Sequence, residues 1–323
     1  MQRIRFTGAG GNEVVDLQTG PDPAVGDEQV LVGARYAGVN PLDVLQRDGH
    51  YPVPPGTSPD LPGVETAGTV MAVGDQVHRW AIGDRVMGLV PEGGLANRVV
   101  AHQDHVLAVP SATSDLAAAT LPEAVMTAFD ALVRARTQLR DVVGIRGING
   151  GVGLATYQIA AAMGAVPLGI ARSTRVIDEL ADLGINAVLE SEFEAAVADG
   201  ASVMVELVGG SYVAQDLHLL ARGGRVVVVS VAAGNEALIP THLLMSKRAD
   251  LMGTVLRPRS TAEKTLLTAA VAQHVLPLVR EHRLVMPVEE IFEAREAWKA
   301  FDHLAKPGKV GKVVLDFGVS ARE

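Results

Sequence analysis

The spacing of apolar residues along the chain changes near residue 120. Before that point, short β-rich segments are separated by turns rich in glycine and proline, among them residues 51–56 and 92–94. The segments with the strongest strand pattern are 30–36, 67–73, 85–90 and 96–101. Many short strands joined by such turns are typical of antiparallel sheets. The first part of the chain is therefore predicted to form a small antiparallel β-barrel.

From residue 121 onward, continuous apolar strands alternate with helical segments. Pro122 suits the first turn of a helix, and apolar residues follow it at spacings of three and four. Strands are predicted at 142–146, 166–170, 203–208 and 226–231, and helices at 175–183 and 211–221. Strands of this kind imply a parallel sheet that is covered by helices on both faces. This part is predicted to be a doubly wound α/β domain.

The tail after residue 258 loses this regular alternation. Ser260 and Glu263 form a capping-box pattern at the start of a helix. A strand is predicted near 284–288, a helix near 292–304 and a final strand at 310–317. We expect the tail to return to the first domain. The expected domains are thus 121–257 and a discontinuous one made of 1–120 and 258–323.

Composition and charge exclude several classes of protein. The 323 residues include 28 Lys and Arg against 37 Asp and Glu, a formal charge of −9, and no cysteine. A negative balance argues against nucleic-acid or membrane partners, which require a positive surface. Without cysteine, neither disulfides nor thiolate zinc sites can form. Residues 1–6 lack the apolar stretch of a signal peptide, so a cytoplasmic location is expected.

A glycine-rich turn follows the predicted strand at 142–146 and leads directly into a helical pattern. Glycines in this position let a pyrophosphate approach the backbone N–H groups at a helix N-terminus. The spacing departs from the plain GxGxxG pattern, and a tight turn without a ligand is the alternative. In this strand–turn–helix context we predict a dinucleotide site. Its residues are Gly147, Asn149, Gly150, Gly151, Val152 and Gly153.

The end of the next predicted strand indicates which nicotinamide cofactor binds. NAD sites usually place an acidic residue about 20 positions beyond the turn, where it holds the ribose 2′-hydroxyl. This chain has Arg172, Ser173 and Arg175 there, and no carboxylate. Two arginines can pair with a 2′-phosphate through charge-assisted hydrogen bonds. Cations at a helix N-terminus are unfavourable because of the helix dipole, and a bound phosphate would offset that cost. The alternative is that both arginines are solvated at the start of a helix and bind no phosphate. We expect NADPH as the cofactor.

Several motifs occur in an order that resembles one protein family. They are AGVNPLD (37–43), GHYP (49–52), LPGVETAG (61–68), GDRV (83–86), LPEA (121–124), GGVG (150–153) and GKVVL (311–315). In these motifs the chain resembles the zinc-independent, zeta-crystallin-like NADPH:quinone oxidoreductases, a branch of the medium-chain dehydrogenases/reductases. The resemblance covers nearly the whole chain. It implies a GroES-like barrel domain built from both chain ends, with a Rossmann domain between them.

The resemblance also implies an activity: hydride transfer from NADPH to a small electrophilic acceptor, a quinone or an α,β-unsaturated carbonyl, by a homodimer. It implies that Asn40 donates a hydrogen bond to the acceptor oxygen, that Tyr51 is a second donor or an aromatic wall, and that Thr127 faces the nicotinamide. Further residues implied near the cofactor are Ser230, Val231, Thr254, Leu256 and Lys312. The alternatives are a turn residue for Asn40, a ring packed in a proline-rich turn for Tyr51, and solvated side chains for Thr127 and Lys312.

The differences from zinc-dependent relatives exclude their metal site. Those enzymes carry Cys-His where this chain has Asn40-Pro41, and a histidine where it has Val64. No metal is therefore expected. His102 and His105 lack a nearby third ligand and are expected to be exposed loop residues.

The expected 2′-phosphate pocket also departs from the family. Relatives often carry Gly-Ser where this chain has Arg172-Ser173, a lysine at Val176 and a tyrosine near Ser191. The resemblance thus implies a pocket that is assembled differently, around Arg172 and Arg175.

Three classes of function remain open. The first is a quinone or enone reductase, the second a reductase of 2-enoyl thioesters, and the third a non-enzymatic NADPH-binding protein. Arg257 and Arg259 lie at the expected domain junction and suggest steering of an anionic acceptor. The alternative is a helix entrance, with Pro258 as a rigid lead-in.

Overall fold

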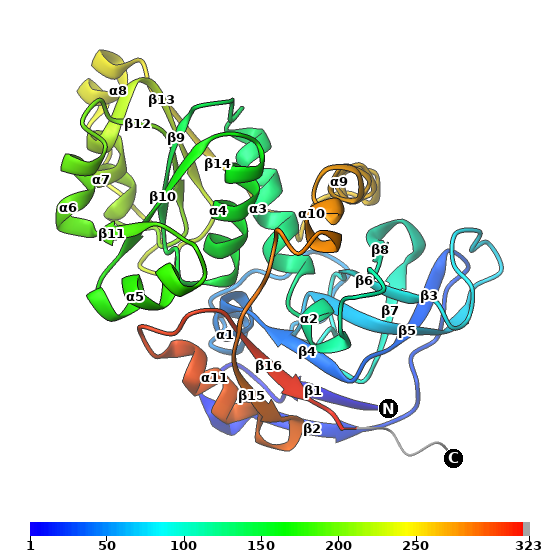
Figure 1. Cartoon of the computed structure of the whole chain (residues 1–323). Helices are drawn as coiled ribbons and strands as arrows, with labels where there is room; N and C mark the ends of the chain where they lie inside the picture. The colour runs from blue at the N-terminus through cyan, green and yellow to red at the C-terminus, as the bar shows by residue number, and fades with distance from the viewer. Residues whose placement is uncertain (319–323) are drawn as a thin grey trace.

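The computed structural model of the chain describes residues 1–318, and its largest sheet has six strands. They follow the order β11 (Ala187–Leu189), β10 (Val166–Ala171), β9 (Val142–Arg146), β12 (Ala201–Glu206), β13 (Leu220–Val228) and β14 (Asp250–Gly253). Each neighbouring pair is parallel. The helices around this sheet are α3 (Pro122–Arg134), α4 (Gly151–Ala162), α5 (Thr174–Asp182), α6 (Glu190–Ala196), α7 (Tyr212–Leu219) and α8 (Thr241–Lys247). Figure 1 shows this lobe in green and yellow.

The central strand β12 explains why helices cover both faces of this sheet. Val203 and Val205 belong to the apolar cluster that includes α3 and α4. Met204, between them, belongs to a second cluster together with Phe193 of α6 and Leu217 of α7. Successive side chains of a strand point to opposite faces, so both faces of β12 are buried. The predicted doubly wound α/β sheet is confirmed.

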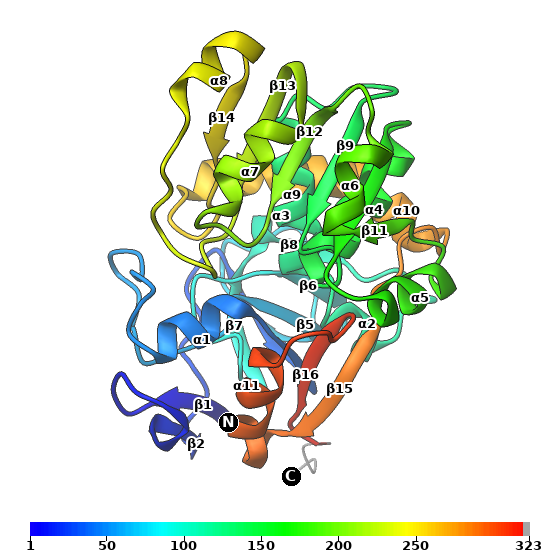
Figure 2. The same cartoon turned by 90° about the vertical axis from the view of Figure 1, so that its left-hand side faces the viewer.

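The two ends of the chain form the other lobe, which contains three smaller sheets. One is antiparallel and has the order β7 (Arg98–His102), β3 (Gln29–Gly33), β5 (Glu65–Val73), β6 (Arg85–Leu89) and β8 (Val106–Ala108). The others are β1 (Gln2–Phe6) with β2 (Val15–Thr19), and β15 (Val288–Glu293) with β16 (Lys312–Asp316) and β4 (Tyr36–Val39). β16 pairs antiparallel with β4, and Figures 1 and 2 show its red arrow in the lobe that holds the blue strands. The tail thus packs on the first part of the chain, while the exact domain limits stay a prediction.

Two segments that precede the tail differ from expectation. The strand expected at 30–36 is two strands, because β3 pairs with β5 and β7 whereas β4 pairs with β16. The helix expected at 211–221 ends at Leu219, and β13 already begins at Leu220. Gly223, expected to terminate that helix, has a φ of 79° inside an irregular part of β13. The sequence pattern could not give the limits of these strands, because each limit depends on the strand with which the segment pairs.

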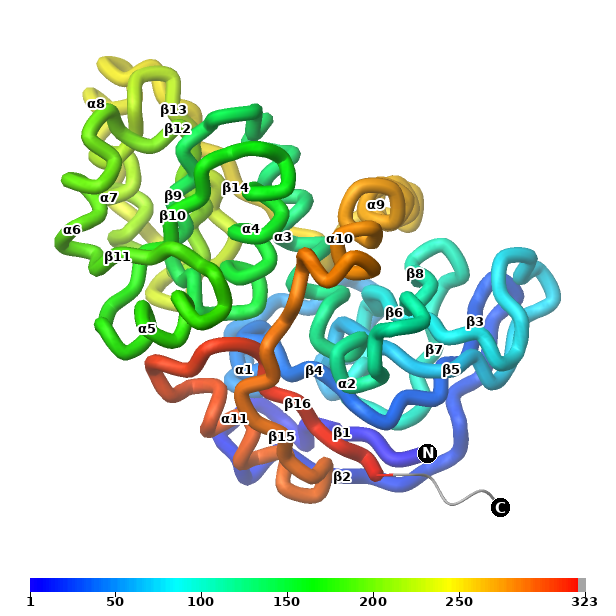
Figure 3. The backbone as a smooth tube through the Cα atoms, in the orientation of Figure 1, coloured from blue at the N-terminus to red at the C-terminus, as the bar shows by residue number. Residues whose placement is uncertain are grey.

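The tail also differs in detail. Leu284 and Met286, expected in a strand, instead join the large apolar cluster, so β15 begins only at Val288. The helices of the tail are α9 (Thr261–His274), α10 (Leu276–Arg280) and α11 (Ala297–Ala305), the last of which starts later than expected. The capping box at the start of α9 is confirmed, since the Ser260 backbone N–H donates to Glu263 Oε2 at 2.9 Å. The tube in Figure 3 follows this path from α10 to β16.

Two short helices complete the lobe formed by the chain ends: α1 (Pro41–Arg47) and α2 (Asp115–Ala118). The sequence analysis did not predict α1, which begins directly after Asn40 with Pro41 at its first position. In the described part of the chain, every helix is too short or too polar to cross a lipid bilayer.

Candidate active site

A cavity of about 980 Å³ lies between the two lobes. Its walls come from α1, the segment 50–55, the start of α3, the glycine turn before α4, the ends of β13 and β14, and β16. The predicted site residues that line it are Asn40, Tyr51, Thr127, Gly147, Asn149, Gly150, Gly151, Val152, Gly153, Ser230, Val231, Thr254, Leu256 and Lys312. The other three, Arg172, Ser173 and Arg175, are not part of its lining.

The glycine turn connects β9 to α4 and has a backbone that only glycine suits. Gly147 has a φ of 81°, in the left-handed region. A Cβ on Gly153 would lie 2.4 Å from the carbonyl oxygen of Gly147, so this close approach requires glycine. The first-turn amides of α4, at Gly151 to Gly153, have no acceptor inside the helix. Such amides form the kind of anion site that a pyrophosphate occupies, so these residues fit a dinucleotide.

Hydrogen bonds attach the glycine turn to the segment that leads into β16. The side-chain amide of Asn149 donates to the carbonyl oxygen of Lys309 at 2.8 Å. In return, the backbone N–H of Gly311 donates to the carbonyl oxygen of Asn149 at 3.0 Å. Because Lys312 follows Gly311 directly, these bonds bring a lysine to the start of α4.

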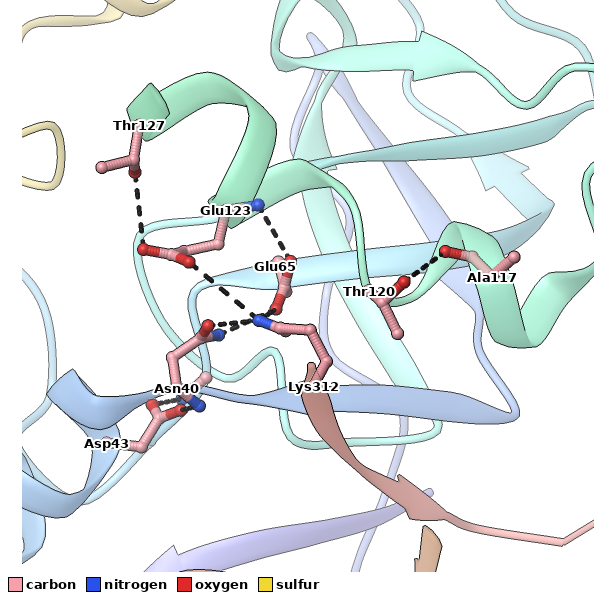
Figure 4. A network of polar contacts seen from close by, with 9 residues as sticks. Asn40, Asp43, Glu65, Ala117, Thr120, Glu123, Thr127 and Lys312 are labelled. Carbon is pink, nitrogen blue, oxygen red and sulfur yellow. Dashed lines mark hydrogen bonds and ion pairs between the residues drawn. The ribbon is translucent and has the colours of Figure 1, made fainter. Parts of the chain in front are cut away.

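A buried ion cluster surrounds Lys312, whose side chain is 4% exposed (Figure 4). Its Nζ donates to Glu65 Oε1 at 2.8 Å and to Asn40 Oδ1, and it lies 4.0 Å from Glu123 Oε2. Glu65 also accepts hydrogen bonds from Asn40 Nδ2 at 2.8 Å and from the backbone N–H of Glu123 at 2.9 Å. The alternative interpretation of Lys312 as a solvated lysine is therefore wrong. The residue lies where β5, β16, α1 and α3 meet.

Burial changes the acid–base properties of this cluster. It raises the pKa of Glu123 to about 7, although the nearby Lys312 opposes that shift. It also raises the pKa of Asp43 to about 6, against two hydrogen bonds from backbone N–H groups. Burial disfavours the ammonium of Lys312 as well, but Glu65 and Glu123 outweigh it, so the pKa of Lys312 rises. Lys312 is therefore charged, and Glu123 ionises near neutral pH.

Asn40 combines two structural roles. It occupies the N-cap position of α1, where its backbone N–H donates to Asp43 Oδ2 at 2.8 Å. Its side-chain oxygen and one of its amide hydrogens bind Lys312 and Glu65. The predicted role as a donor to the acceptor oxygen thus depends on the remaining amide hydrogen and stays a prediction.

The two arginines near the end of β14 have different surroundings. Arg257 lines the cavity, and its Cζ lies 5.4 Å from the centre of the Tyr51 ring. Its Nε donates to the carbonyl oxygen of Pro91 at 2.9 Å. Arg259 instead binds both carboxylate oxygens of Asp130, at 2.7 and 2.8 Å. Steering of an anionic acceptor stays a prediction for Arg257, whereas Arg259 is already held by an ion pair.

Comparison with known proteins assigns the chain to a family. Residues 26–111 match the alcohol dehydrogenase GroES-like domain, and residues 151–272 match the zinc-binding dehydrogenase domain. The quinone oxidoreductase of Mus musculus is 32% identical over 98% of this chain and 97% of its own length. The chain belongs to the quinone oxidoreductase family.

Solved structures agree with this assignment. The quinone oxidoreductase from Coxiella burnetii superposes with a TM-score of 0.82 at 27% identity, over 98% of this chain and 99% of that one. The CurK enoyl reductase superposes with a TM-score of 0.85 at 26% identity, over 98% of each chain. This quinone oxidoreductase family member is thus a medium-chain oxidoreductase with a GroES-like and a Rossmann part, as the sequence motifs indicated.

Its histidines differ from expectation. His105 is 7% exposed and lines the cavity, so the expectation of an exposed loop residue was wrong for it. Its ring stacks on His102 with the ring centres 4.7 Å apart, and its Nε2 lies 3.2 Å from the carbonyl oxygen of Thr261. Contacts with α9 bury this side chain, which a sequence pattern does not reveal. Within residues 1–318, no three His, Asp or Glu side chains gather closely enough to hold a metal ion.

The residues predicted for the 2′-phosphate lie at the start of α5, the helix for which Ser173 is the N-cap. Arg172 and Arg175 are both exposed. Arg175 binds Glu179 and the carbonyl oxygen of Gly308, so its guanidinium is partly engaged. No carboxylate lies within 4 Å of Arg172 in the described part of the chain. Arg172 is therefore the freer of the two cations.

Sequence reasoning missed several residues of this site. Glu65 and Glu123 stood in the quoted motifs, but neither was assigned a role. Lys309 also lines the cavity. Burial lowers the pKa of Lys309, Glu289 opposes this shift, and the charge of Arg172 adds to it. Only the return of the C-terminal strand brings these charges together, and no local signal in the sequence reports it.

Proposed function

We propose that this family member is an NADPH-dependent oxidoreductase that transfers a hydride, without zinc, to a quinone or to the β-carbon of an α,β-unsaturated carbonyl. The observation that supports this most is the meeting of the glycine turn and the Lys312 cluster in one cavity with largely apolar walls. When bound, NADPH would supply the hydride. Asn40 and Val64 offer no zinc ligands, which favours an acceptor that is already electrophilic. Stoichiometric zinc that is lost together with activity would contradict this proposal.

Different parts of the cavity wall would bind the pyrophosphate, the nicotinamide and the acceptor. The first-turn amides of α4 would hold the pyrophosphate, and Thr127, Ser230, Val231, Thr254 and Leu256 would position the nicotinamide. Tyr51 and the remaining amide hydrogen of Asn40 would stabilise the oxyanion that develops on the acceptor. An assay that follows NADPH absorbance with a panel of quinones and enones tests the proposal. Absence of turnover with every acceptor would favour the non-enzymatic alternative.

The cofactor preference gives a direct prediction. NADPH should bind more tightly than NADH by about 1.5–3 kcal/mol, the range of charge-assisted hydrogen bonds to a phosphate. Arg172→Ala should reduce this preference and leave NADH affinity nearly unchanged, because no ion pair of Arg172 with residues 1–318 would be lost. We expect Arg175→Ala to act in the same direction. Titration of cofactor fluorescence measures the affinities of the native protein and of both variants for NADPH and for NADH.

The control for these variants is Arg79→Ala. Arg79 is an exposed arginine that pairs with Asp104 in the β-rich lobe, so its loss removes the same charge elsewhere. It should leave both cofactor affinities unchanged. Equal affinity of the native protein for NADPH and NADH would contradict the prediction.

A 2-enoyl thioester is the second candidate acceptor. The structural similarity to the CurK enoyl reductase, at 26% identity over 98% of this chain, favours it. The hydride chemistry is the same, but the substrate is carried by a thioester. A strong preference in kcat/KM for thioesters over free enones would select this alternative.

We also propose a cytoplasmic homodimer. The absence of cysteine suits a reducing compartment. Large apolar side chains are exposed on the edge strand β14 (Leu251), on α8 (Met245) and in the loop before α8 (Leu238). Exposed apolar side chains at a sheet edge favour pairing with a second copy. A sedimentation mass of a single chain would contradict the dimer.

A further inference from the structure

Glu123 lines the cavity, but the proposed hydride transfer assigns no role to it. It is the second residue of α3, its side chain is 14% exposed, and it lines the cavity together with Thr127, one turn later. The hydroxyl of Thr127 donates a hydrogen bond to Glu123 Oε1, with Oγ1 and Oε1 3.4 Å apart (Figure 4). Among the described residues that line the cavity, Glu123 is the only carboxylic acid.

The cation nearest to Glu123 in this cluster, Lys312, is paired with another carboxylate. Lys312 lies 4.0 Å from Glu123 Oε2 but only 2.8 Å from Glu65 Oε1. Glu65 therefore neutralises the ammonium, and Asp43 adds a further acidic group to the same cluster. A second ionised carboxylate in such a buried site is unfavourable, because one lysine cannot compensate two of them. Glu123 thus retains a proton up to a pH of about 7.

The reduction of an enone requires such a proton. Hydride addition to the β-carbon moves the C=C electron pair to the carbonyl oxygen and leaves an enolate. To complete the reaction, the returning electron pair must take a proton at the α-carbon. A neutral carboxylic acid in the cavity wall can supply it, whereas a charged lysine that already donates to two acceptors is a poorer source.

We propose that Glu123 is the general acid of this enzyme and that the hydroxyl of Thr127 passes its proton to the α-carbon of the acceptor. Protonated Glu123 would donate to Thr127 Oγ1, the reverse of the hydrogen bond in the structure, and the Thr127 hydroxyl would then turn its proton toward the acceptor. The O–H bond of Glu123 breaks as Thr127 Oγ1 takes the proton, and the original Thr127 proton forms the new C–H bond. The carboxylate that remains recovers a proton from water. This inference rests on the proposed function and names a catalytic residue for it.

The test uses an α-substituted enone in D₂O, with NADPH, and the full-length chain. The wild type should place deuterium on one face of the α-carbon, and its kcat should fall as the pH rises through about 7, because Glu123 then loses its proton. Glu123→Gln keeps the shape but has no acidic proton. It should lower kcat for the enone about 100-fold or more, abolish the pH dependence and scramble the α-carbon configuration.

Quinone reduction provides the internal comparison. The oxygens of a reduced quinone take protons rapidly from water, so Glu123→Gln should lower its rate less than about 10-fold. Glu290→Gln, at an exposed carboxyl on β15, is the control for the chemical change and should behave as wild type. Thr127→Val should reproduce the loss with the enone, and Thr127→Ser should restore the activity.

The possible outcomes separate the two proposals. Wild-type rates and stereospecific deuteration in Glu123→Gln would overturn the assignment of Glu123, and so would an equal loss for quinone and enone, which indicates a structural role. Should Glu123→Gln fail to fold, the Thr127 pair decides: unchanged stereochemistry in Thr127→Val overturns the relay. A wild-type protein that oxidises NADPH with neither acceptor overturns the proposed function itself.

Discussion

Replacement of Gly151 by aspartate should lower the affinity for NADPH by at least about 100-fold. A Cβ at this position would lie 2.7 Å from Lys312 Cδ and 3.4 Å from the Cβ of Ala124, so the lysine chain must shift. The new carboxylate would also stand at the first residue of α4. There it would compete with the pyrophosphate for the partial positive charge of the helix N-terminus. Fluorescence enhancement of NADPH on binding measures the affinity.

Gly8→Asp is the matched control for this substitution. Gly8 is exposed, and a Cβ there would have no neighbour within 4 Å, so the variant carries the same charge change without a clash. It should bind NADPH as the wild type does. Circular dichroism shows whether both variants are folded. Normal NADPH binding by a folded Gly151→Asp variant would place the cofactor elsewhere.

Replacement of Lys312 by methionine should reduce the free energy of unfolding by about 3–5 kcal/mol, the usual cost of removing one partner of a buried ion pair. Methionine keeps most of the volume of the side chain, so the effect arises from charge. Glu65, which is 1% exposed, would retain hydrogen bonds from Asn40 and Glu123 but lose Lys312, the only cation that pairs with it within residues 1–318. Urea denaturation at neutral pH measures the change.

Two further variants make this prediction specific. Lys299→Met removes a half-buried lysine that pairs with Glu296 at 2.6 Å and should change stability by less than about 1 kcal/mol. The double variant Lys312→Met/Glu65→Gln removes both charges and should recover most of the loss, because an uncharged amide is easier to bury than a carboxylate. A Lys312→Met variant as stable as Lys299→Met would mean that the ion cluster does not stabilise the fold.

Local patterns in the sequence were sufficient for the main elements of the fold and for the cofactor turn. The apolar strands around β9 and β12, the capping box at Ser260 and the glycine turn at Gly147 each depend on neighbours within a few residues. Their conformations follow from side-chain periodicity, from a side chain that caps its own helix, and from a φ that only glycine readily adopts. The order of motifs was specific enough to indicate the family.

What the sequence by itself determined is thus most of the main helices and strands, the family and the segment that would hold a dinucleotide. Tertiary structure alone decided the limits of β13 and β15, the burial of His105, and the cluster of Lys312 with Glu65 and Glu123. Lys312 and Glu65 are 247 positions apart, and they meet because β16 pairs with β4. The charge state of Glu123 follows from this meeting, since burial and neighbouring charges set a pKa, and both are properties of the folded chain.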